Sequence, residues 1–89
     1  MKTLEKREPA MEQLLLDRIV LNPLVMLGKP LIRGTRIPVE IIVRMVGQGI
    51  AESEILREYP RLTIDDIRAA LTYAADVLAR EDVFPTPMS

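Results

Sequence analysis

The chain has 89 residues, of which 48% are apolar and only 3% aromatic, and its formal net charge is −1. This length allows one domain, with a small core of aliphatic side chains that suits packed helices better than an all-β sandwich. Because cysteine and histidine are both absent, disulfides and thiolate metal sites are excluded, and the commonest metal ligand and general base are missing.

The first part of the chain predicts a leader followed by a strand. Residues 1–12 mix charges with a proline and show no period, which is typical of a flexible leader. Residues 14–23, LLLDRIVLNP, are apolar with β-branched residues and end at Asn22-Pro23, which predicts a strand and a turn. Asp17 and Arg18 interrupt the apolar run, so it is neither a signal peptide nor a membrane span.

A second short strand is predicted over residues 31–37, LIRGTRI, and it completes a β-ribbon. Strict alternation from Ile32 would turn Arg36 inward, which is unfavourable. A bulge at Gly34-Thr35, where two residues count as one, corrects the register, so that Ile32 and Ile37 both face the core. Arg33 and Arg36 are then expected side by side in solvent.

The first predicted helix follows Pro38, which fixes φ at the helix start, and has the sequence VEIIVRMVGQG. Glu40 and Arg44 are spaced to pair at i,i+4 on its exposed side. Gly49 is the expected left-handed residue beyond its end. A second helix is predicted over residues 52–58, with Glu54 placed for a capping box, and Tyr59-Pro60 stops it.

The third predicted helix begins after Thr63 and continues to about Arg80. Thr63 is the expected N-cap and Asp66 closes the capping box. A stripe at helical spacing predicts the face that packs on the core, and it comprises Ile67, Ala70, Leu71, Ala74 and Leu78.

These elements predict a mainly α fold, a three-helix helix-turn-helix domain of homeodomain-like or winged-helix-like type with a short N-terminal β-ribbon. The domain is expected over residues 13–82, with a tail over residues 83–89. The residues expected to be structural are Gly34, Pro38, Gly49, Pro60, Thr63 and Asp66.

Basic residues near the ribbon and around the third helix are the candidate functional residues. Residues 17–44 contain five basic and two acidic residues, whereas residues 45–89 contain four basic and eight acidic. The candidates for contact with DNA are Lys29, Arg33, Thr35, Arg36, Arg61 and Arg68. The alternative is that these cations pair with nearby acids and contribute little. Asp65 and Asp66 are interpreted as helix-capping residues, because they lie where the helix dipole favours a carboxylate.

No constellation of residues predicts catalysis, a nucleotide site, a cofactor or a metal site. Gly28-Lys29-Pro30 lacks the further glycines and the Ser or Thr of a phosphate loop. No group offers a nucleophile, a base and an oxyanion hole together. We therefore expect a cytoplasmic, non-enzymatic protein with no small-molecule substrate and no membrane partner.

The segments DRIVLNP, GKPLIRGTRIPVEIIV and GQGIAESEILREYPRLTIDDIRAALTYAADVL resemble domain-of-unknown-function family 433 over about residues 14–78. The resemblance implies a helical domain with an N-terminal β-ribbon, often dimeric. It also implies a VapB-type antitoxin, which would bind a PIN-like ribonuclease toxin and the operator DNA of its own genes. Ala51 departs from the family pattern, which usually has a capping serine there.

Two hypotheses follow from the sequence. In the first, the protein is a homodimeric, DNA-binding, antitoxin-like protein that neutralises a PIN-like toxin. In the second, it is a protein-interaction module without DNA binding, whose acidic second half contacts a basic partner. If the protein is an antitoxin, either the leader or residues 81–89 would bind around the toxin.

Overall fold

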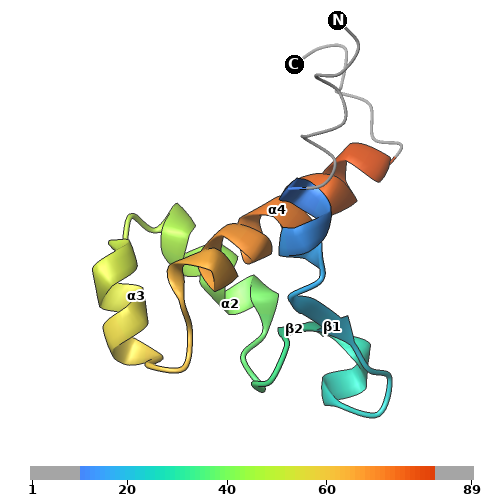
Figure 1. Ribbon diagram of the computed structural model, residues 1–89, viewed down its shortest axis with the longest axis horizontal. Coiled ribbons are helices and arrows are strands. Elements are labelled where there is room, and N and C mark those ends of the chain that lie inside the picture. Colours follow the sequence, from blue (N-terminus) through green and yellow to red (C-terminus); the bar gives the residue numbers. More distant parts are fainter. Residues whose placement is uncertain (1–10, 82–89) are drawn as a thin grey trace, which may run out of the picture.

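The computed structural model describes residues 11–81 of the chain (Figure 1). It is mainly helical with one small antiparallel sheet, as the sequence predicts. Residues 11–16 are helical. The elements that follow are β1 (Ile19–Leu21), the short 3₁₀ turn η1 (Met26–Gly28), β2 (Pro30–Ile32), α2 (Val39–Gly47), α3 (Glu52–Glu58) and α4 (Ile64–Arg80).

The first strand is much shorter than predicted. Only Ile19–Leu21 pair with β2, in the register Ile19↔Ile32 and Leu21↔Pro30, and residues 11–16 form a helix instead. The physical reason lies in the side chains: Met, Glu, Gln and Leu at positions 11–16 favour a helix, and β-branched residues begin only at Ile19. The predicted leader over residues 1–12 was therefore too long at its end, and residues 1–10 and the predicted tail lie outside the described residues.

A tight turn, not a bulge, reverses the chain after β2. Gly34 has φ +81°, and the N–H of Thr35 donates to the Ile32 carbonyl oxygen at 3.0 Å. The N–H of Ile32 then donates to the Ile37 carbonyl oxygen at 3.0 Å, and Leu31 bridges Pro38. Ile32 is fully buried and Ile37 packs against the core, so their predicted inward orientation is confirmed. A turn is favoured here because glycine adopts this φ without steric cost.

α2 begins directly after Pro38 and ends as predicted. The N–H groups of Gly49 and Ile50 donate to the carbonyl oxygens of Val46 and Met45, at 3.0 and 3.1 Å, and Gly49 has φ +83°. These two bonds form a Schellman motif, which satisfies the last carbonyl groups of the helix. The capping box predicted for α3 is absent, because no side chain makes a capping hydrogen bond at the N-cap residue Ala51. The Glu54 carboxylate instead lies 3.8 Å from the Arg57 guanidinium.

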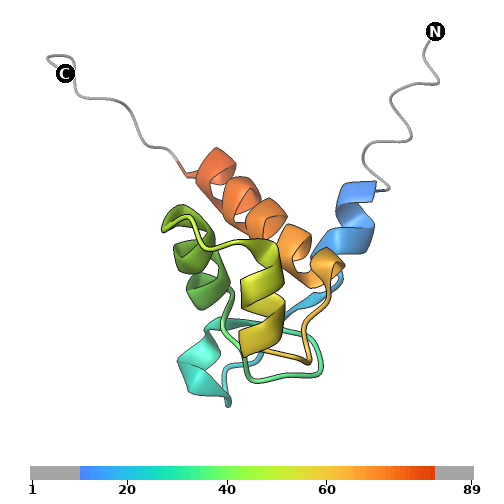
Figure 2. The ribbon, with the colours of Figure 1, turned by 90° about the vertical axis from the view of Figure 1, so that its left-hand side faces the viewer.

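The core lies where α2, α3 and α4 meet above the ribbon (Figures 1 and 2). Its fully buried large side chains are Ile32, Ile42, Ile55 and Ile67. The stripe predicted on α4 is buried only at its N-terminal end: Ile67 and Ala70 are buried, whereas Leu71 is exposed and Leu78 keeps 67% of its surface. The nine-residue α2 is too short to cover a 17-residue partner, so the last turns of α4 extend beyond the core.

Candidate nucleic-acid interface

Three of the predicted DNA-contacting residues lie around the turn that follows β2, and we call Arg33, Arg36 and Arg61 the basic edge. Arg33 and Arg36 flank Gly34, while Arg61 comes from the short connection between α3 and α4. A long hydrogen bond of 3.4 Å from Arg61 Nη1 to the Gly34 carbonyl oxygen joins the two segments. The fold therefore brings the segments that carry these cations, which are 25 to 28 positions apart in the sequence, to the same turn.

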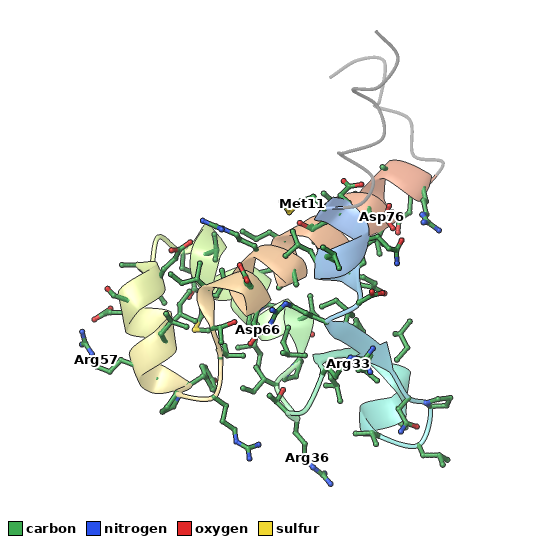
Figure 3. The ribbon with its side chains drawn as sticks, viewed as in Figure 1. Met11, Arg33, Arg36, Arg57, Asp66 and Asp76 are labelled. Atoms are coloured by element: carbon green, nitrogen blue, oxygen red, sulfur yellow. The ribbon has the colours of Figure 1, made fainter. Side chains whose placement is uncertain are left out.

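Arg33 and Arg36 do not project side by side as predicted. Arg33 lies back along the ribbon, where its Nε donates to the Asp17 carbonyl oxygen at 2.8 Å. Arg36 points away from the domain (Figure 3). A turn separates the two side chains, whereas a bulge would have kept them on one face.

Thr35 stabilises this turn with its side chain. Its hydroxyl donates to the Ile32 carbonyl oxygen at 2.8 Å and accepts from the Ile37 N–H at 3.0 Å. Threonine and serine hydroxyls commonly make such local bonds in turns. The turn that presents Arg36 is therefore held by its own side-chain bonds as well as by the backbone.

The basic edge carries uncompensated positive charge. Within residues 11–81, none of Arg33, Arg36 and Arg61 has a carboxylate within 4.0 Å. The other two predicted cations do have acidic neighbours. Lys29 pairs with Glu40 at 3.2 Å, and Arg68 lies 3.8 Å from Asp65.

Glu40 lies at the centre of a separate exposed ion cluster. Its carboxylate accepts from Arg44 at 2.7 Å, which is the predicted i,i+4 pair, and from Lys29 at 3.2 Å. The hydrogen bond from Arg44, followed by that from Lys29, lowers the pKa of the Glu40 carboxyl below its ordinary value. Lys29 is thus held on the outside of α2, and it is not part of the basic edge.

Asp66 is buried and makes more bonds than the predicted capping box. Its Oδ2 accepts from the Thr63 N–H at 2.9 Å, and the Thr63 hydroxyl accepts from the Asp66 N–H at 3.2 Å. Its Oδ1 is 3.0 Å from Arg18 Nη1, and Asp65 lies 3.6 Å from the same guanidinium. Asp66 therefore caps the helix, and together with Asp65 it holds the start of the ribbon against α4 through Arg18, a partner that sequence reasoning missed.

An open apolar groove of about 580 Å³ lies between α2 and the C-terminal half of α4. Its apolar lining residues include Pro30, Val39, Val43, Tyr73, Val77 and Leu78, and the charged residues Glu40 and Arg44 line it as well. A partial signal of this groove was present in the sequence, because the stripe on α4 continues to Leu78 while α2 ends early. The sequence did not show which part of the stripe would remain uncovered.

Two further classes of site are not found in the described part of the chain. Acidic side chains do not gather there in groups of three that would hold a metal ion. Among residues 11–81, no helix combines the length and the apolar character needed to cross a membrane.

The fold and the basic edge define a small, mainly helical protein with a two-stranded ribbon and a cationic turn. The chain belongs to the family described as "Protein of unknown function (DUF433)", whose model matches residues 19–74. It is similar to the crystal structure of a DUF433 member protein from Anabaena variabilis, with 36% identity and a TM-score of 0.64. That match covers 85% of this chain and 75% of the other. No curated protein matches the chain significantly.

Proposed function

We propose that the chain is a non-enzymatic, DNA-binding protein of the VapB-type antitoxin kind, acting in the cytoplasm. The observation that carries this proposal is the basic edge, where three guanidinium groups have no acidic partner among the described residues. Arginines in this situation bind phosphate oxygens, and such contacts supply most of the affinity of a protein for DNA. The side-chain hydrogen bonds of Thr35 and the positive φ of Gly34 fix the conformation of the turn in the absence of DNA.

The helical half supports a helix-turn-helix assignment of the homeodomain-like or winged-helix-like type. α3 and α4 are joined by only residues 59–63, and α2 packs against both. In such pairs the second helix places its N-terminal residues at the base edges. Here that end carries Asp65, which repels phosphates, beside exposed Ile64 and Leu71. We therefore assign the phosphate contacts to the basic edge and not to Arg68, whose guanidinium lies 3.8 Å from the Asp65 carboxylate.

The proposal is tested by measuring the affinity for the DNA upstream of the protein's own gene, using two double variants of equal charge. Arg36→Ala with Arg61→Ala removes two cations of the basic edge. Lys29→Ala with Arg68→Ala removes two cations that already have acidic neighbours. We expect the first variant to bind much more weakly than the second. Equal losses in both would mean that bulk charge and not the basic edge binds the DNA.

A second candidate function is binding of a protein partner, such as a PIN-like toxin, without DNA. It is favoured by α3, which exposes Glu52, Glu54 and Glu58 and matches a basic nuclease cleft in charge. Co-purification with the product of the adjacent gene in the absence of DNA tests it. Replacing Glu52 and Glu58 with glutamine should then weaken that complex while leaving any affinity for DNA intact.

A further inference from the structure

The loop between β1 and β2 exposes two leucines almost completely. Leu24 keeps 92% of its surface and Leu27 keeps 97%, more than the other exposed large apolar residues of the described chain. Leu27 also has φ 56° and ψ 32°, and it is the one non-glycine residue with positive φ between residues 11 and 81. This conformation is unfavourable for leucine, and such outliers cluster at functional sites such as ligand clamps and switch regions. The loop tip therefore has the character of a binding surface.

The same side of the molecule holds the α2–α4 groove. In Figure 2 the loop and α2 lie along the same side of the domain. Pro30 lines the groove and comes only three residues after Leu27, so the loop tip lies near one end of the groove, with the Lys29–Glu40 ion pair between them. At the other end of the groove, Leu78 projects from the last turns of α4. One chain thus carries both an apolar projection and an apolar hollow.

We propose that a second copy of the chain covers this face, with Leu24 and Leu27 of each copy inserted in the α2–α4 groove of the other. In a two-fold dimer each contact is made twice, so the loop of each copy is buried and the groove of each copy is filled. An interface of ordinary size covers about 800 Å² of each partner, more than a loop tip provides, and reciprocal docking adds the groove to the buried area.

The charges around the face agree with this occupant. Residues 22–28, NPLVMLG, are uncharged, so their insertion buries no ionic group. Lys29 directly follows the loop, and Glu40 lies at the rim of the groove. Insertion of the loop therefore brings the Lys29 ammonium of one copy toward the Glu40 carboxylate of the other, which is the pair that forms within the chain at 3.2 Å.

The proposal specifies the interface of the homodimer that the first hypothesis from the sequence expects, but it rests on the loop and the groove and needs no DNA. Its first test is sedimentation of the DNA-free protein over a wide range of concentrations. The wild type should dimerise, and Leu24→Ser with Leu27→Gly should weaken association by roughly tenfold or more per leucine. Glycine at position 27 adopts the positive φ without the steric strain that leucine has there, so this variant should remain folded. Leu14→Ser, on residues 11–16 at the other side of α4, is the control that should leave association unchanged.

A cross-linking test identifies the contact itself, because the chain has no cysteine. A mixture of Leu27→Cys protein and Val77→Cys protein should give a mixed disulfide under mild oxidation, whereas Leu14→Cys with Val77→Cys should not. A wild type that stays monomeric at millimolar concentration overturns the proposal, even if another protein binds the groove. So does a dimer in which Val77→Cys links only to itself. The Arg36→Ala with Arg61→Ala variant should still dimerise, which separates failure here from failure of DNA binding.

Discussion

Arg18 and Asp66, which are 48 positions apart in the sequence, lie 3.0 Å from each other across the boundary between the ribbon and the helices. Asp66 is nearly buried, with 7% of its surface exposed, and its second oxygen caps α4. One carboxylate therefore both begins the longest helix and holds the β-ribbon against it. The orientation of the basic edge depends on this attachment, because Arg33 and Arg36 follow β2 directly.

Replacing Asp66 tests this double role. Asp66→Ala loses the cap, worth about 1 kcal/mol, and a charged hydrogen bond, so we expect a loss of roughly 2–4 kcal/mol in the free energy of unfolding. Asp66→Asn keeps an acceptor for the Thr63 N–H and should lose about half as much. Urea unfolding measures both. Asp65→Asn, at an exposed position 3.6 Å from Arg18, is the control, and a loss as large as that of Asp66→Ala would contradict the assignment.

The turn after β2 depends on the backbone conformation of Gly34. No atom lies within 4 Å of a Cβ built at Gly34, so the cost of Gly34→Ala is conformational and amounts to about 1 kcal/mol. Gly47→Ala is a matched control, since that position is equally open but lies in α2. It should stabilise the protein by roughly 0.5–1 kcal/mol. Thermal unfolding of the two variants should therefore shift in opposite directions, and a stabilised Gly34→Ala would disprove the turn.

The ion cluster at Glu40 makes a prediction about pH. The folded-state pKa of Glu40 is lowered, so the contribution of the cluster to stability is present above the ordinary pKa of 4.5. That contribution is lost as pH falls through the lower, folded-state value. NMR titration of the Glu40 carboxyl should show the lowered pKa, and Arg44→Gln and Lys29→Gln should each raise it, because a hydrogen bond from each of these cations lowers it. An unchanged pKa in both variants would show that the cluster does not persist in solution.

The start of α3 is open to improvement. Ala51 has the extended backbone of an N-cap but no side chain that can accept a hydrogen bond. Ala51→Ser should therefore stabilise the protein by roughly 0.5–1 kcal/mol, and Thr63→Ala should destabilise it by about 1 kcal/mol through loss of the existing cap. Chemical denaturation measures both. If serine at position 51 had no effect, the helix start would not limit stability.

Local sequence signals predicted the helices well because their ends are determined locally. Thr63 with Asp66, Gly49 after α2, and Pro60 after α3 each act within a few residues, and α4 ends at Arg80 as expected. The ribbon was predicted less well. Helical preference over residues 11–16 and the conformation of Gly34 were both misjudged, since an apolar run and a glycine are each compatible with two structures.

The sites depended on contacts that no local pattern encodes. Arg18 with Asp66 and Arg61 with Gly34 join segments 48 and 27 positions apart. Lys29 and Arg36 looked equivalent in the sequence, yet among residues 11–81 only Lys29 has a carboxylate beside it, because the turn directs Arg36 away from the domain. The groove is likewise a result of unequal lengths, as α4 continues beyond the end of α2.

The salt dependence of DNA binding tests the central claim most directly. Three phosphate contacts per copy predict that the logarithm of affinity falls with the logarithm of salt concentration, with a slope of about −3 for one copy and about −5 for two. Arg36→Ala with Arg61→Ala should reduce the slope by roughly one unit per lost contact. DNA binding whose slope is unchanged in that variant, or a wild type that binds no DNA at low salt, would contradict the account.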